Sequence, residues 1–187
     1  MHTKTKRFIL GFTLSATVLM SGCTPMKVMF ERPFGSSEDV AYGDKLWKEL
    51  QARGYNTELS VLHEGATPHG QVVEVLEGKI DGKTVLVKRN YRGEEITVDA
   101  VKKDRAAYLK AITVMAKREA GYDTENQDWF YAQYKPDGSY VKKMGMIPVV
   151  GRVAKGIDNV NCISCHMASP TGNFRFTSDK TLIREIL

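Results

Sequence analysis

The stretch Gln71–Tyr91, QVVEVLEGKIDGKTVLVKRNY, decides which architecture the chain adopts. It contains two β-rich runs, over residues 71–79 and 83–91, on either side of Asp81-Gly82. Short β-rich runs that are joined through an Asp-Gly pair are typical of a β-hairpin. A four-helix bundle has no place for such a hairpin, so we predict a fold with an antiparallel sheet.

Two segments further along the chain add strands to this sheet. Residues 127–135 form an aromatic run, which the Pro-Asp-Gly triplet at 136–138 turns into a second strand over 139–146. Residues 149–155 are a last apolar stretch before the cysteines near the end of the chain. The order of these signals predicts a largely antiparallel sheet.

Two other segments have the periodicity and the end signals of helices. Ser36 begins a capping signature, and apolar residues at helical spacing continue to Ala52, with Gly54 ending the helix. Residues 99–120 place apolar side chains on one side of a second helix, which Gly121 stops. The sequence therefore predicts an α+β fold, with a mostly antiparallel sheet and two main helices.

The start of the chain predicts export. A basic region of Lys4, Lys6 and Arg7 precedes an apolar run over residues 8–20. That run is short for a membrane-spanning helix, which needs roughly 20 apolar residues, and it has the form of a signal peptide. A small-residue pair then leads to Cys23, as in a lipobox, where cleavage falls before a lipidated cysteine. An ordinary signal peptide with a stray cysteine is the alternative interpretation.

This leader sets the domain organisation and the compartment. We expect a signal peptide over 1–22, a lipidated cysteine and tether over 23–36, and one domain over 37–187. The lipid would anchor a domain that faces the periplasm, and Thr24 after the cysteine predicts the outer membrane where there is one. The leader carries much of the net charge of +5, and no stripe of lysine and arginine predicts binding to nucleic acid.

The segment NVNCISCHM near the C-terminus contains Cys162, Cys165 and His166. Structural zinc usually takes four ligands, and a redox dithiol usually lies near the start of a βαβ unit. A histidine directly after C-x-x-C is typical of c-type haem, which two thioethers hold while the imidazole binds the iron. We therefore predict one covalent haem c with His166 as the proximal ligand; zinc and a dithiol are the alternatives.

The position of this motif leaves the sixth iron ligand open. Met167 is the only methionine after the motif, and it cannot reach the opposite face of the haem. A sixth ligand must come from Met144, Met146 or His69, or be absent, which would leave the iron open to a small molecule. Alternatively, the two methionines belong to a strand core and the histidine to a loop.

Taken in order, four stretches resemble the cytochrome P-460 family, to which the β-type cytochromes c′ also belong. The stretches are PHG at 68–70, DGKTVLVKRNY at 81–91, AGYDTENQDWFYAQYKPDG at 120–138, and CISCHMAS at 162–169, followed by NFRF. The resemblance implies a small, sheet-rich domain with a five-coordinate c-type haem, often as a homodimer.

The resemblance implies one of two functions. In the enzymatic branch, which oxidises hydroxylamine, a strand lysine makes a third covalent bond to a haem meso carbon, and the matching residue here is Lys88. In the β-type cytochrome c′ branch this bond is absent, and the haem binds nitric oxide or carbon monoxide. Strand alternation places Lys88 on one face with Leu86, and Val85 and Val87 on the other. A solvent-facing strand lysine is the alternative for Lys88.

A departure from the family's pattern concerns catalysis. The enzymatic branch has a carboxylate over the distal haem, because the oxidation releases protons that a base must accept. The matching stretch, KAITVMA at 110–116, has no carboxylate. Three hypotheses therefore remain: an oxidoreductase acting on hydroxylamine or nitric oxide with a soluble or membrane redox partner, a gas-binding cytochrome, and a six-coordinate electron carrier.

Overall fold

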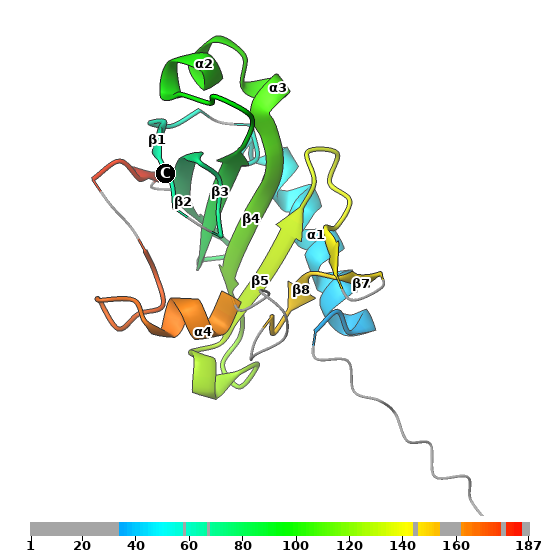
Figure 1. Ribbon diagram of the computed structural model, residues 1–187. Helices are drawn as coiled ribbons and strands as arrows, with labels where there is room; N and C mark the ends of the chain where they lie inside the picture. The colour runs from blue at the N-terminus through cyan, green and yellow to red at the C-terminus, as the bar shows by residue number, and fades with distance from the viewer. Residues whose placement is uncertain are drawn as a thin grey trace, which may run out of the picture. The chain divides into compact units, whose positions relative to one another are not determined.

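An antiparallel sheet forms the centre of the domain (Figure 1). The structure is a computed structural model that describes residues 34–57, 59–66, 68–143, 146–153, 162–176 and 179–184, all within the unit Glu31–Leu187. The predicted leader, Cys23 and most of the predicted tether lie outside the described residues. In the ranges that the structure describes, no helix is long and apolar enough to cross a membrane.

The main sheet has seven strands, in the order β1-β2-β3-β4-β5-β8, and β9 pairs with β2 beside this path. The β2–β9 pair is parallel and the other pairs are antiparallel. The strands are β1 (His63–Glu64), β2 (Val72–Ile80), β3 (Lys83–Tyr91), β4 (Leu109–Lys117), β5 (Trp129–Tyr134), β8 (Val150–Gly151) and β9 (Leu182–Ile183). A separate two-stranded ladder joins β6 (Lys142–Lys143) to β7 (Ile147–Pro148).

The predicted hairpin is confirmed, with β2 and β3 paired along their whole length. Its turn residues Asp81 and Gly82 have φ angles of 50° and 72°, which is the positive-φ conformation that an Asp-Gly turn adopts. The aromatic strand is also confirmed, as β5. The strand predicted over 139–146 is much shorter, because Tyr140 makes only an isolated bridge to Tyr134 before β6 begins.

Four helices are described: α1 (Ser37–Ala52), α2 (Val98–Lys103), α3 (Arg105–Tyr108) and α4 (Cys162–Met167). The first predicted helix is confirmed, and the Ser36 side chain caps it by accepting a hydrogen bond from the backbone of Asp39 at 3.0 Å. A short 3-10 helix, η1 (Thr124–Asn126), lies before β5. The fold is therefore α+β with a mostly antiparallel sheet, as predicted.

The second long helix, predicted over 99–120, is wrong. Asp104 has non-helical backbone angles and divides the start of this segment into α2 and α3. Residues 109–117 form strand β4, which pairs with β3 on one side and β5 on the other. The consecutive β-branched residues Ile112, Thr113 and Val114 favour a strand, and pairing on both edges outweighs the helical spacing.

The two faces of the sheet carry separate cores. Val85, Val87 and Val114 face one side, where they pack with the α1 residues Leu46 and Leu50. The opposite face carries a second cluster, in which Ile163 of α4 packs with strand residues from the middle of the sheet: Leu86, Met115, Trp129 and Tyr131. Alternation along β3 is therefore as predicted, and α4 belongs to the face opposite α1 (Figure 1).

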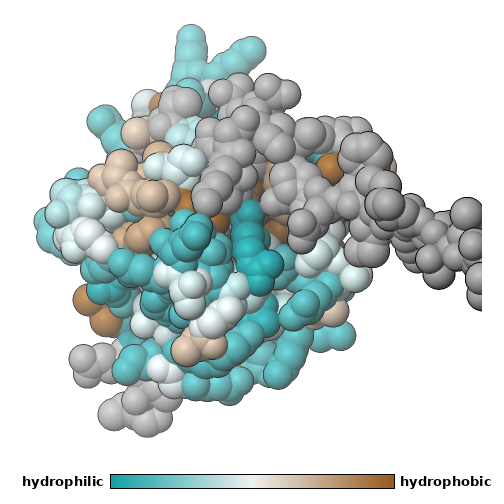
Figure 2. Space-filling model, turned by 90° about the horizontal axis from the view of Figure 1, so that it is seen from below, coloured by the Kyte–Doolittle hydropathy of each residue, from teal (hydrophilic) through white to brown (hydrophobic). Residues whose placement is uncertain are grey.

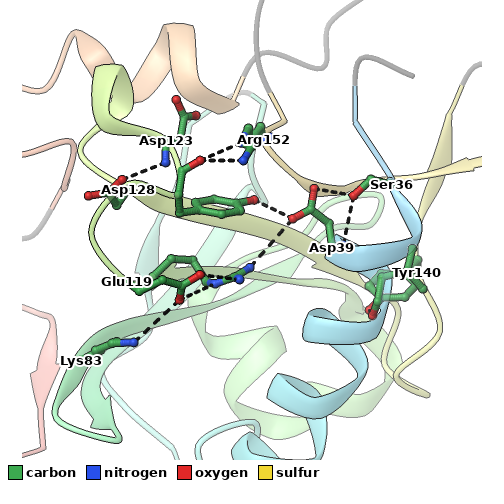
Figure 3. A network of polar contacts seen from close by, with 11 residues as sticks. Ser36, Asp39, Lys83, Glu119, Asp123, Asp128, Tyr140 and Arg152 are labelled. Carbon is green, nitrogen blue, oxygen red and sulfur yellow. Dashed lines mark hydrogen bonds and ion pairs between the residues drawn. The ribbon is translucent and has the colours of Figure 1, made fainter. Parts of the chain in front are cut away.

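A buried polar network fixes the first turn of α1 to the loop before β5 (Figure 3). The carboxylate of Asp39 accepts hydrogen bonds from Tyr122 Oη at 2.7 Å and from Ser36 Oγ at 2.9 Å. The Arg118 guanidinium lies 3.9 Å from the same carboxylate. The Arg152 side chain donates to the Tyr122 carbonyl at 2.6 Å, so the network also ties down the segment that follows β8.

Candidate functional site

The candidate site lies on the sheet face that carries α4. In the ladder between β3 and β4, Lys88 is opposite Thr113 and Leu86 is opposite Met115. Met115 is in turn opposite Tyr131 on β5. These five side chains therefore project from the same face as the cluster that receives Ile163 of α4, and we refer to this surface as the site face.

Helix α4 presents the two cysteines of the motif one turn apart. Cys162 and Cys165 are both free thiols, the first half-buried and the second exposed. Ile163 between them has 0% of its surface exposed, and its backbone N–H donates to the Val153 carbonyl at 3.1 Å. The buried isoleucine thus anchors α4 to the sheet and fixes the helix that carries both thiols.

His166 has one ring nitrogen occupied and the other available. Nδ1 lies 2.6 Å from the Phe174 carbonyl, which can only accept, so Nδ1 is the donor. A neutral imidazole that donates through Nδ1 keeps the lone pair of Nε2 for a metal, and metal-binding histidines are commonly oriented in this way. The rings of Tyr131 and Phe176 pack edge-on against His166, with centroids 5.5 Å and 5.3 Å away.

The loop that supplies the Phe174 carbonyl is held by its own hydrogen bonds. The buried Ser169 hydroxyl donates to the Arg175 carbonyl at 2.5 Å, and Asn173 accepts from the Arg175 backbone at 3.0 Å. Arg175 also donates from its side chain to Glu77 on β2, at 2.6 Å. The loop after the motif therefore holds His166 in place through the Phe174 carbonyl. In the sequence, this loop appears only as the stretch NFRF.

Lys88 is a half-buried lysine whose charge acts on both histidines of the site. Burial lowers the pKa of its amine. Burial also lowers the pKa of His166, and the Lys88 charge lowers it further. Lys88 is therefore partly shielded from solvent on the site face.

His69 approaches the same site from the loop before β2. Its ring centroid is 6.5 Å from that of His166, with the two planes at 82°. Its pKa is lowered to about 3, by burial first and then by the charges of Lys88 and His166. By contrast, the Met146 side chain is 68% exposed, and Met144 lies outside the described residues.

Whether these residues fit a covalent haem can be judged from their chemistry. Two free thiols one helical turn apart, followed by a histidine with a free Nε2, are the donor set of a c-type haem. Apolar surface is also present beside the motif, because Met167 and Phe176 are 55% and 42% exposed. Figure 2 views the end of the domain that carries α4, and shows hydrophobic patches on a largely hydrophilic face. The donor set and its surroundings fit the group.

The two alternatives for the cysteines find less support. Within the described ranges, no group of three or more histidine, cysteine, aspartate or glutamate side chains could hold a metal ion. A reactive dithiol needs a thiol whose pKa is lowered, but burial raises the pKa of Cys162 to about 12. In this part of the chain the motif therefore has no further zinc ligands beside it, and the Cys162 thiol is not an activated one.

The stretch 110–116, where the family's carboxylate was expected, lies on β4. Of the acidic residues near it in sequence, Glu119 is exposed and paired with Arg118 and Lys83. The carboxylate that the site face does carry is Glu77, which is opposite Leu86 on the neighbouring strand. Sequence reasoning missed it because its partner, Arg175, is 98 positions away along the chain.

The chain was compared with protein-family models, with curated proteins and with solved structures, and none of the three comparisons found a match.

Proposed function

We propose that the chain is an exported, lipid-anchored, mono-haem c-type cytochrome of the cytochrome P-460 type, with an open iron site for small nitrogen species. Cys162 and Cys165 would form the thioethers and His166 would bind the iron. The observation that carries the proposal is that α4, with its thiol pair and the free Nε2 of His166, packs on the sheet face from which Lys88 projects. When bound, the haem supplies one-electron chemistry and an iron that takes small ligands.

The residues of the chain would tune this chemistry in separate ways. The Phe174 carbonyl fixes the tautomer of His166 and raises the basicity of Nε2 toward the iron. Ile163 and Met115 provide an apolar wall beneath the motif. Glu77 and Arg175 place an ion pair at the edge of the same face. Substrate oxidation, of hydroxylamine or nitric oxide, would pass electrons to a soluble or membrane-bound redox partner.

Two other functions keep the same cofactor. A gas-binding cytochrome would hold nitric oxide or carbon monoxide without turning it over, which suits a site face where the stretch 110–116 has no carboxylate. An electron carrier would have its sixth position closed, and the approach of His69 to His166 favours that arrangement. A homodimer, which the resemblance implies, is compatible with all three functions.

Haem attachment is the first test of this proposal. Wild-type protein exported from a host that matures c-type cytochromes should retain haem on a denaturing gel and show one haem in its intact mass. Cys162→Ala combined with Cys165→Ala should remove both thioethers, so any haem that survives denaturation is then held by Lys88. The triple variant with Lys88→Ala should carry no covalent haem. A wild-type protein of apo mass after such export would contradict the proposal.

The His166→Ala variant separates the attachment from the iron ligand. It should keep covalent haem through the cysteines, yet lose the wild-type absorption spectrum, because the proximal imidazole is gone. The matched control is His63→Ala, since the His63 ring contacts the carbonyl of Val61, on a different segment from α4. An unchanged spectrum in His166→Ala would remove His166 as the ligand.

The lipid anchor is tested separately, because Cys23 lies outside the described residues. Wild-type protein should fractionate with membranes and carry a diacylglyceryl modification on Cys23. The Cys23→Ser variant should lose this modification and move to the soluble fraction, because the lipid on Cys23 is the proposed anchor. Subcellular fractionation with a haem stain measures this. Membrane association that persists in Cys23→Ser would contradict the lipobox interpretation.

A further inference from the structure

We infer that the ion pair between Arg175 and Glu77 positions the proximal iron ligand, because it holds the peptide group to which His166 donates a hydrogen bond. The inference rests on the proposed function, since it needs a haem on the motif with His166 on its iron. It deepens that function by giving two residues outside the motif control over the reduction potential of the iron.

The proximal imidazole depends on one backbone group. His166 Nδ1 lies 2.6 Å from the Phe174 carbonyl, which is short for a hydrogen bond between nitrogen and oxygen. Such a bond shifts negative charge onto the ring and makes Nε2 a stronger donor to a metal. Because a stronger donor stabilises ferric iron more than ferrous iron, the position of this carbonyl affects the reduction potential.

The Phe174 carbonyl lies in a loop, and regular secondary structure does not hold it. The φ angle of Phe174 is 63°, a conformation that is unusual for a bulky residue and persists only where the surroundings impose it. Its side chain is buried in the same cluster as Ile163 of α4, which fixes the ring. The orientation of the carbonyl is therefore left to the next residue, whose N–H belongs to the same planar peptide group.

That next residue, Arg175, is held by three separate hydrogen bonds. Its backbone N–H donates to Asn173 Oδ1 at 3.0 Å, which fixes the plane of the peptide group. Its carbonyl accepts from the buried Ser169 hydroxyl at 2.5 Å. Its guanidinium donates from Nη1 to Glu77 Oε1 at 2.6 Å, the length of a strong, charge-assisted hydrogen bond.

The bond to Glu77 differs from the other two because it ties the loop to the sheet. Asn173 and Ser169 are members of the loop and would move with it. Glu77 lies inside β2, where it is paired with Leu86 of β3 on one side and with Ile183 of β9 on the other. Its side chain is only 17% exposed. The sheet thus provides a rigid anchor, and the ion pair transmits this anchor to the peptide group beside His166.

Loss of the ion pair should raise the reduction potential. The freed peptide group would no longer keep its short contact with His166, so Nε2 would become a weaker donor and ferric iron would lose more stabilisation than ferrous iron. Outer partners of metal ligands are typically worth about 10–100-fold in metal affinity or activity. We expect about a tenfold change in the ratio of ferric to ferrous protein, which is about 59 mV for a one-electron couple.

The experiment uses haem-loaded Glu77→Ala and Arg175→Met, which remove opposite charges. If the pair acted only through its charges, the first variant would raise the potential and the second would lower it. A positioning role predicts that both raise it, and that the double variant shifts no further than either alone. Spectroelectrochemical titration measures the potential. Resonance Raman spectra of ferrous protein should show the iron–histidine stretch at lower frequency in all three variants.

Two kinds of control accompany these variants. Glu49→Ala and Arg53→Met make the same substitutions in an ion pair at 3.5 Å on α1, and should keep the wild-type potential and frequency. Gln127→Ala removes a different bond to the loop, from its side chain to the Gly172 carbonyl at 2.9 Å, and should also behave as wild type. By contrast, Ser169→Ala changes no charge, yet should raise the potential and lower the frequency, because it frees the same peptide group.

Each contrary result has one meaning. Potentials that shift in opposite directions in Glu77→Ala and Arg175→Met, or an iron–histidine frequency that neither changes, overturn the inference and leave the proposed function standing. A Gln127→Ala variant that shifts as far as Glu77→Ala also overturns it, because general loosening of the loop then explains the effect. A wild type without covalent haem overturns the proposed function, and the inference with it. Should a charge variant fail to fold by circular dichroism, Ser169→Ala provides both measurements.

Discussion

Replacement of Glu74 by alanine should lower the free energy of unfolding by about 3–5 kcal/mol, because it removes one member of a buried ion pair. Glu74 lies on β2 with 1% of its surface exposed, and its Oε1 is 2.8 Å from Arg89 Nε. The same carboxylate accepts from the Tyr91 hydroxyl and from the Ser60 backbone N–H, and Arg105 approaches at 3.5 Å. The variant leaves a buried guanidinium and a buried hydroxyl without their acceptor.

Urea denaturation, followed by circular dichroism, measures this change. The matched control is Glu64→Ala, since Glu64 is exposed on the neighbouring strand β1, and its loss should change stability by about 0.5 kcal/mol or less. Glu74→Leu combined with Arg89→Met should recover the part of the loss that comes from the unpaired guanidinium, because an apolar pair replaces the two buried charges, while the Tyr91 hydroxyl still lacks its acceptor. A Glu74→Ala variant as stable as Glu64→Ala would show that the ion pair contributes nothing.

Local signals in the sequence predicted the parts of the fold that depend on local structure. The Ser36 cap, the Asp81-Gly82 turn and the aromatic run of β5 each act over a few residues, and each lies where it was expected. The helix prediction over 99–120 was wrong because the apolar residues of this segment fit both a helical and a strand period. Pairing with β3 and β5 decides between the two, and such long-range pairing cannot be read from one segment.

The candidate site also has parts that local sequence could predict and parts that depend on long-range packing. The thiol pair and His166 are contiguous in sequence, and alternation along β3 is enough to put Lys88 on one face of the hairpin. The approach of His69 to His166 and the bond from Arg175 to Glu77 close long loops of chain. They depend on where α4 settles on the sheet, which the buried Ile163 determines. Sequence reasoning named His69 as one of three candidate ligands, and only the structure shows that its ring lies near His166.

The Lys88→Ala variant should lose a third covalent bond to the haem and, with it, the strongly red-shifted ferrous Soret band that the wild type is expected to show. The amine must be neutral to act as a nucleophile, but an ordinary lysine has a pKa of about 10.4 and is protonated at neutral pH. Burial on the site face lowers the pKa of Lys88, which increases the neutral fraction at working pH. The new nitrogen–carbon bond replaces one N–H and one meso C–H bond, so its formation consumes a two-electron oxidant, such as a peroxide.

Lys117 provides a matched control for Lys88. It projects from β4, two positions beyond Met115, and burial lowers its pKa as well, but it lies over the Trp129 ring at 4.8 Å and bonds to the Gln127 carbonyl. Lys117→Ala should therefore keep the wild-type spectrum.

A tryptic map of the wild type should contain the 162–166 peptide joined through haem to a peptide with Lys88, and Lys88→Ala should yield the cysteine-linked peptide alone. If wild type and Lys88→Ala give the same ferrous spectrum and the same haem peptide, Lys88 forms no bond, and the protein is better explained as a gas-binding relative of the β-type cytochromes c′. A shared low-spin spectrum that only His69→Ala converts to high-spin would instead favour the electron carrier, because a closed iron and an unmodified macrocycle suit transfer rather than substrate oxidation.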